Sequence, residues 1–138
     1  MSTATIRDSG DGLVASHVSV TDRCGRVIVD DVSVSARSGR TLVIVGESGA
    51  GKSMLARTLC ALTPSAFVAS GAVSLGGETF DLAADQGRLK KQRGGGIVWL
   101  PQDPFTSLAP TLPCGEQISA ARTGRRSERA QRARALLA

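Results

Sequence analysis

The sequence predicts an α/β fold in which an antiparallel pair of strands precedes a strand–loop–helix unit that binds phosphate. Three observations predict it. Apolar residues alternate with polar ones in two segments near the N-terminus, a continuous apolar run leads into a glycine-rich loop, and apolar residues then recur at helical spacing. Alternation is typical of half-buried strands, whereas continuous apolar runs are typical of parallel strands that are buried on both faces.

The first two strands are expected to form a hairpin. Val14, Val18 and Val20 alternate with polar residues, and alternation returns within residues 27–36. The turn that joins these segments is expected near Gly25. Residues 1–12 are polar and are expected to form a disordered start, which leaves residues 13–138 as one domain. Within it, residues 13–62 would hold the β subdomain and the phosphate loop.

A strand, a loop and a helix are expected after the hairpin. The run TLVIVG at residues 41–46 predicts a strand buried on both faces. A helix is expected from Lys52, because leucines recur on one of its faces, and Pro64 is expected to end it. These leucines are Leu55, Leu59 and Leu62.

The second half of the chain predicts shorter elements. Residues 71–82 indicate a short strand and a turn, and residues 85–93 a short polar helix or a loop. Residues 97–100 indicate a second buried strand. Prolines then favour an irregular loop up to residue 113. Two helices are expected last, over residues 114–121 and 127–138, with Ser127 as the N-cap of the second.

The net charge of +5 is concentrated at the C-terminus. Residues 122–138 hold six arginines against Glu128, whereas the 11 basic and 11 acidic residues before them balance. A basic tail can bind nucleic acid or anionic lipid. It can also be the solvated side of a helix whose apolar face carries Ala130, Ala133 and Leu137. No aromatic side chain lies among these arginines to stack on a base, so the solvated helix is favoured and no specific nucleic acid is expected.

Membrane insertion and disulfide bonding are both disfavoured. No apolar run exceeds four residues, and no charged segment followed by an apolar one stands at the N-terminus. Cys24, Cys60 and Cys114 are odd in number, lie far apart and match no zinc spacing. They are therefore interpreted as reduced thiols in a cytoplasmic protein.

The glycine-rich segment GESGAGKS fits the phosphate-loop pattern G-x-x-x-x-G-K-[ST] without a gap. Glycines let the backbone turn so that its N–H groups face phosphate oxygens, and the N-terminus of the following helix adds a positive dipole end. Lys52 supplies a cation for the β- and γ-phosphates, and the Ser53 hydroxyl is a Mg²⁺ ligand. The predicted nucleotide-binding residues are Gly46, Glu47, Ser48, Gly49, Ala50, Gly51, Lys52 and Ser53.

A second segment, IVWLPQDPFTSLAPTLPCGEQI at residues 97–118, extends this interpretation. It resembles the Q-loop region of ABC transporter ATPases, and within them the di- and oligopeptide importer branch. The GESGAGKS form of the phosphate loop is similar to that branch too. Order and spacing also agree, because antiparallel strands come first and Gln102 follows the phosphate loop by about fifty residues. The resemblance covers the chain from about residue 13 to its end.

The resemblance implies a P-loop NTPase core with an N-terminal antiparallel β subdomain and the start of a helical subdomain, truncated. The Q-loop would span about residues 97–113, and the partial helical subdomain about residues 114–138. ATP and Mg²⁺ would be the cofactors, with Gln102 reaching the metal and the γ-phosphate as a sensor, so that Ser53 and Gln102 are the predicted metal ligands. Implied partners are transmembrane permease subunits and a second nucleotide-binding subunit. The protein would then lie on the inner face of the cell membrane, attached only through the permease.

The sequence departs from that family in two ways. The family's adenine-stacking aromatic residue is replaced near Asp22, with His17 and Arg23 as the other candidates to meet the base. The signature motif, the strand ending in Asp-Glu and the His switch do not occur within the 138 residues. Asp103, Glu116 and Glu47 do not replace the missing carboxylates, because none ends a buried strand beside the phosphate loop. The chain is therefore expected to bind nucleotide without turning it over.

Alternatives to an importer ATPase stay open at this point. A non-catalytic fragment that binds a nucleotide or a partner subunit is favoured for this chain by itself. Another class of P-loop NTPase is less favoured, because no Asn-Lys-x-Asp guanine-binding motif occurs. A nucleic-acid binder that uses the arginine-rich tail is disfavoured for the reason given above.

Overall fold

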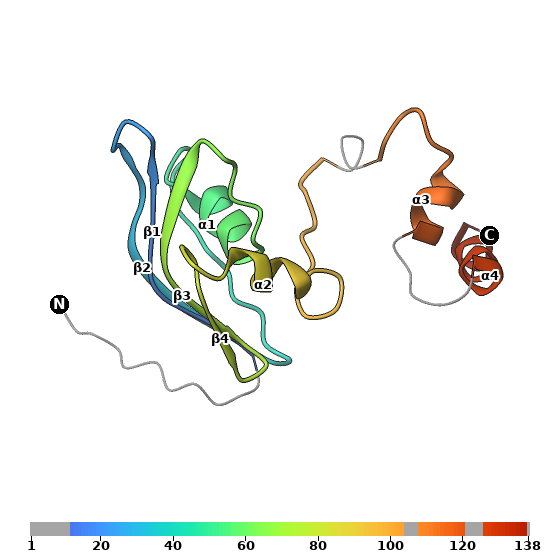
Figure 1. Ribbon diagram of the computed structural model, residues 1–138, viewed down its shortest axis with the longest axis horizontal. Coiled ribbons are helices and arrows are strands. Elements are labelled where there is room, and N and C mark those ends of the chain that lie inside the picture. Colours follow the sequence, from blue (N-terminus) through green and yellow to red (C-terminus); the bar gives the residue numbers. More distant parts are fainter. Residues whose placement is uncertain (1–11, 104–107, 121–125, 138) are drawn as a thin grey trace. The chain divides into compact units, whose positions relative to one another are not determined.

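The computed structural model describes residues 12–103, 108–120 and 126–137 (Figure 1). The chain divides into two compact units, Met1–Trp99 and Leu100–Ala138. The expected disordered start lies outside the described residues up to residue 11, and Gly12 begins the first strand.

The first unit is built on a four-stranded antiparallel sheet with the order β2-β1-β3-β4 (Figure 1). The predicted hairpin near Gly25 is confirmed as the β1–β2 pair. The strand and turn predicted over residues 71–82 belong to a second hairpin that turns at Gly76 and Gly77. The strands are β1 Gly12–Asp22, β2 Val27–Arg37, β3 Phe67–Leu75 and β4 Glu78–Asp81.

A bulge interrupts the β1–β2 ladder and changes which side chains face the core. His17 and Asp31 have positive φ values of 53° and 44°, and the pairing register shifts between Ala15 and Val18. The backbone N–H of His17 donates to Ser33 Oγ at 2.9 Å. Because the bulge adds one residue, Ala15 and Val18 are both fully buried, although strict alternation would place them on opposite faces.

The core lies between the sheet and α1, which spans Lys52–Leu59 and contacts β1 and β2. Its predicted apolar face is confirmed at Leu55 and Leu59, which are buried. The prediction that Pro64 ends this helix was wrong. The helix ends four residues earlier than expected from that proline, because Ala61 adopts a left-handed conformation (φ 53°) and the N–H of Leu62 returns to the carbonyl of Arg57 at 2.8 Å.

The segment of residues 85–93 contains the short helix α2, Gln86–Lys91, which packs against β4. Leu89 is its buried residue, at 1% exposure. The largest fully buried side chains among the described residues come from the sheet, from α1 and α2, and from the residue that follows β4. They are Phe80, Leu82, Leu89, Val18, Val20, Val73 and Thr58.

The two predicted parallel strands are absent, so both predictions were wrong. Residues 41–46 form no strand, and Val43 and Val45 are 72% and 85% exposed. Of residues 97–100, only Ile97 is buried and it forms an isolated bridge with Arg93, whereas Val98 is 76% exposed. A strand buried on both faces needs neighbouring strands, and the described residues supply none beside either run.

The second unit contains two helices that pack on each other, α3 Cys114–Ala120 and α4 Arg126–Leu137. Both helices were predicted. Ser127 is not the N-cap of α4, because the helix already begins at Arg126. Ala133 is buried at 2% exposure, in agreement with the expected apolar face of α4, while Arg132 and Arg134 are exposed.

Candidate functional site

The phosphate loop connects the exposed run of residues 41–46 to the N-terminus of α1. Gly49 and Gly51 have φ values of 85° and 81°, a conformation that glycine adopts without strain. A turn closes the loop, with the N–H of Ala50 donating to the carbonyl of Glu47 at 3.2 Å. Gly51 is the N-cap of α1 and offers no side-chain acceptor. The first N–H groups of the helix therefore receive no side-chain cap and suit an anion.

Lys52 folds back over this loop. Its Nζ donates to the carbonyl of Gly46 at 2.8 Å and to that of Glu47 at 2.6 Å. These bonds hold the ammonium group on the loop side of α1. An incoming phosphate would meet the lysine charge and the helix N-terminus from the same direction, which is the arrangement that P-loops use.

The loop is held close to the sheet at one point, Gly51. A Cβ at this position would lie 2.5 Å from the carbonyl oxygen of Ile28 and 3.1 Å from Cγ2 of Val29. Any larger residue would therefore push the loop away from β2. Since β2 begins at Val27, the β1–β2 turn and the phosphate loop belong to the same end of the sheet.

The β1–β2 turn carries Asp22 and Arg23, two of the three residues that the sequence offers as candidates to meet a base. The Asp22 carboxylate accepts the N–H groups of Cys24 and Arg26, each at 2.9 Å, and pairs with the Arg26 side chain at 3.2 Å. The hydrogen bond from Arg26 N–H is the main cause that lowers the pKa of Asp22 below its ordinary value. Asp22 thus acts as a cap for the turn.

The other two candidates for meeting the base also have protein partners. Arg23 donates through Nη2 to the carbonyl of Ser65 at 3.0 Å. His17 lies in the bulge, with its Nδ1 at 2.7 Å from Asp31 Oδ1. No aromatic residue precedes Phe67 in the sequence. Phe67 itself pairs with Asp22 in the β1–β3 register, at this end of the sheet, and is half-buried. Neither Asp22 nor Arg23 offers the aromatic ring on which a base stacks, an interaction that elsewhere contributes about 1–3 kcal/mol.

The residues of the loop fit a magnesium-bound triphosphate. Ser53 follows Lys52 in the first turn of α1 and is exposed, so its hydroxyl is accessible to a metal ion. Hydroxyl oxygen is a hard ligand of the kind that Mg²⁺ binds together with phosphate oxygens. No cluster of three or more His, Cys, Asp or Glu side chains occurs within residues 12–103, 108–120 and 126–137. A metal at this site would thus be held mainly by Ser53, the nucleotide and water.

Gln102, the predicted sensor, is an exposed residue of the second unit. It lies in a bend and does not follow a strand. The eight residues of the phosphate loop lie together in the first unit, whereas Gln102 belongs to the second unit. Within the same stretch, Phe105 and its neighbours from residue 104 to residue 107 lie outside the described residues.

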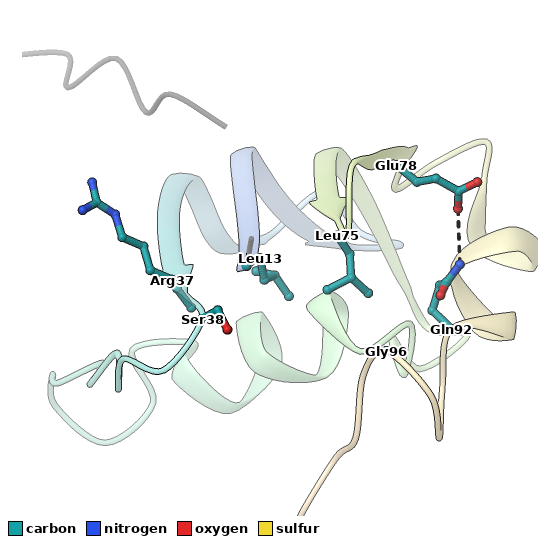
Figure 2. Close-up of a pocket in the computed structure, with 10 residues that line it drawn as sticks. Leu13, Arg37, Ser38, Leu75, Glu78, Gln92 and Gly96 are labelled. Atoms are coloured by element: carbon teal, nitrogen blue, oxygen red, sulfur yellow. Dashed lines mark hydrogen bonds between the residues drawn. The ribbon is translucent and has the colours of Figure 1, made fainter. Parts of the chain in front are cut away.

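An open pocket of about 450 Å³ lies at the other end of the sheet (Figure 2). Figure 2 shows Leu13 and Leu75 side by side at its centre, with Glu78 hydrogen-bonded to Gln92 at one side and Arg37 turned outward at the other. In the sheet register, Gly12 pairs with Arg37, far from the Thr21–Val27 pair at the turn. No phosphate-loop residue lines this pocket. We assign no role to it.

Two observations concern membrane-spanning helices and cysteines. Within the part that the structure describes, no helix is long and apolar enough to cross a membrane. Cys24, Cys60 and Cys114 are all free. Partial burial raises the pKa of the Cys60 thiol, so this cysteine is not activated as a nucleophile.

Comparison with known proteins identifies relatives that are named as ATP-binding proteins of transport systems. The family model described as ABC transporter matches residues 29–138. A putative peptide import ATP-binding protein of Brucella ovis is 38% identical over 98 residues, which cover 67% of this chain and 29% of that protein. The dipeptide transport ATP-binding protein DppD of Bacillus subtilis is 38% identical over 108 residues, which cover 76% of this chain and 32% of that protein.

A third relative is the uncharacterized ABC transporter ATP-binding protein YejF of Escherichia coli, which is 40% identical over 95 residues, or 67% of this chain and 18% of that protein. The chain thus spans less than a third of the length of these three curated relatives. The family match covers most of the chain and includes the whole phosphate loop. The chain therefore belongs to the ABC transporter family, as a partial ATP-binding domain of the P-loop NTPase type.

Proposed function

We propose that this chain is part of the ATP-binding component of a peptide importer and that it binds Mg²⁺–ATP at residues 46–53. The observation that carries the proposal is the phosphate loop itself. Gly49 and Gly51 adopt left-handed conformations, Lys52 folds over the loop, and the helix behind it has no side-chain cap. The relatives that match the chain are named as peptide or dipeptide import ATP-binding proteins.

Mg²⁺ is proposed to bind at Ser53, with Gln102 as a further ligand once nucleotide is present. A glutamine amide can accept from a water molecule and donate to a phosphate oxygen, which suits a sensor of the γ-phosphate. The described position of Gln102, exposed and outside any strand, leaves this amide accessible.

Permease subunits and a second nucleotide-binding subunit are the proposed partners. The segment after Gln102 supports a protein contact, because Leu108 and Leu112 are 43% and 52% exposed in a loop flanked by prolines. The chain would reach the inner face of the cell membrane through the permease. The imported peptide would contact the permease and not this chain.

ATP hydrolysis by these 138 residues alone is not proposed. Phosphoryl transfer needs a carboxylate for the metal's hydration shell and a group that orients the attacking water. Glu47 lies in the phosphate loop and Glu116 in α3, and neither ends a strand beside the nucleotide site. Since loss of a general base costs about 10²- to 10⁴-fold in rate, phosphate release should stay at background.

Titration calorimetry with Mg²⁺–ATP tests the proposal. We expect weak binding with little preference over Mg²⁺–GTP, and loss of most of the affinity in Lys52→Ala, because this substitution removes the cation from the loop. Lys90→Ala is a matched control, since Lys90 is an exposed lysine of α2 away from the loop. Unchanged affinity in Lys52→Ala would refute the site. Phosphate release near 1 s⁻¹ that disappears in this variant would refute the absence of turnover.

A further inference from the structure

The loop that directly precedes α3, residues 108–113, is held by one side chain. The Oε1 of Gln117 accepts the N–H of Ala109 at 2.8 Å. The Nε2 of the same residue donates to the carbonyl of Ala109 at 3.0 Å and to that of Leu112 at 2.8 Å. Three hydrogen bonds therefore join a residue of α3 to a loop that precedes the helix.

These three bonds use both N–H donors of the primary amide and its oxygen as an acceptor. An oxygen acceptor and two N–H donors on one planar group match one backbone N–H and two carbonyls, as a neighbouring strand would. The loop adds a backbone bond of its own, from Leu112 N–H to the Ala109 carbonyl at 3.2 Å. Pro110 and Pro113 have no N–H to satisfy and restrict φ, so they further limit the conformations of the loop.

We propose that Gln117 is a positioning residue that fixes the conformation of loop 108–113 before any partner binds. The loop would then present Leu108 and Leu112, both exposed, as a preformed apolar contact. Preformed loops lose less conformational entropy on association than flexible ones do. The partner would be the permease, and this part of the inference rests on the proposed function. The arrangement of the loop is a property of this chain.

Only glutamine meets these requirements at position 117. Asparagine is one methylene shorter and would withdraw its amide from the loop. A glutamate carboxylate can accept from Ala109 N–H, but it would repel the two carbonyls that now accept from Nε2. A protonated carboxyl can accept one bond and donate another, so Gln117→Glu should regain part of the contact below the ordinary pKa of a glutamate, about 4.3.

Amide hydrogen exchange of the full chain, followed by NMR, tests the proposal. In the wild type, the N–H groups of Ala109 and Leu112 should be protected. In Gln117→Ala their protection should fall by about tenfold, since three hydrogen bonds are lost. Glu116→Gln is a matched control, because Glu116 is the preceding residue of α3 and is exposed. This control should leave the protection of both N–H groups unchanged.

The pH dependence of Gln117→Glu separates positioning from general destabilisation of α3. Relative to wild type at the same pH, protection should be lost at pH 7 and partly restored near pH 4, whereas Gln117→Ala should show no restoration. Equal protection of Ala109 in all variants would overturn the proposal. So would loss in Gln117→Glu that is the same at both pH values, because an unfolded α3 would not respond to the carboxyl proton.

Nucleotide affinity distinguishes a failure of this inference from a failure of the proposed function. Mg²⁺–ATP affinity should be the same in Gln117→Ala and wild type, and Lys52→Ala should leave the protection of Ala109 unchanged. A wild-type chain that fails to bind nucleotide yet shows the protected loop would refute the proposed function and retain the positioning role. Nucleotide binding without any protection of the loop would do the reverse.

Discussion

Single residues decide how the antiparallel sheet accommodates its bulge. His17 and Asp31 face each other with positive φ values, and each has its N–H bonded to a serine of the opposite strand. The third strand must pass close to this point. A Cβ on Gly71 would lie 2.3 Å from the carbonyl oxygen of His17. The bulge therefore requires glycine at position 71.

Substitution of Gly71 tests this requirement. Gly71→Ala should lower the free energy of unfolding of the first unit by about 3–4 kcal/mol, because a φ of 99° and a backbone clash act together. Gly76→Ala is the control, since its φ is 58° with open space around it, and it should cost about 1–2 kcal/mol. Urea unfolding measures both values. Equal losses in the two variants would contradict the close approach.

The Asp22 cap makes the β1–β2 turn sensitive to acid. Its pKa is lowered in the folded chain, mainly by the hydrogen bond from Arg26 N–H. A lowered pKa means that the turn is stabilised above the ordinary value of 3.8 and loses this stabilisation as the pH falls through the lower folded value. Exchange of the Cys24 and Arg26 amides should therefore accelerate relative to the rest of β1 below about pH 4. The variant Asp22→Asn should show no such step, and a step that persists in it would exclude Asp22 as the cause.

Sequence patterns predicted some residues of the site and missed others. The spacing of the phosphate loop is a consequence of phosphate geometry, so its residues could be named from the sequence, and their binding of nucleotide stays a prediction. The bulge at His17 and the role of Gln117 were not predicted. Both depend on side-chain hydrogen bonds between residues separated by five or more positions, such as Gln117 with Ala109, and no local periodicity reports them.

Whole elements were predicted well where their pattern was local. The β1–β2 hairpin and α1 follow from alternation and from helical spacing of leucines. The runs at residues 41–46 and 97–100 were predicted as buried strands and are not strands. Continuous apolar character shows that a segment is suited to a strand between two others. It does not show that such neighbours are present, and the described residues provide none.

The exposure of Val45, in the run of residues 41–46, gives a prediction for the free energy of unfolding. Val45→Lys should change the free energy of unfolding of the first unit by no more than about 0.5 kcal/mol, because the side chain is 85% exposed. Leu82→Ala should lower it by about 2–5 kcal/mol, since Leu82 is 1% exposed in the core. Chemical denaturation compares the two. A loss in Val45→Lys as large as that in Leu82→Ala would show that residues 41–46 pack against the sheet.

In the whole molecule, the arginine-rich helix α4 and the phosphate loop belong to different units. The arginines of α4 belong to the second unit, whereas the phosphate loop belongs to the first. The family match joins both units in one domain type. We propose that triphosphate binds at the loop alone, and not at the arginine-rich helix or in the pocket of Figure 2.

NMR of the ¹⁵N-labelled chain during titration with Mg²⁺–ATP tests this assignment most directly. We expect saturable shifts of the backbone amides of residues 46–53, and none at Leu13 or Gly96 in the pocket or at Arg132 in α4. Lys52→Ala should abolish the shifts at the loop. Shifts confined to the pocket or to α4, with the amides of residues 46–53 unchanged, would refute binding at the phosphate loop.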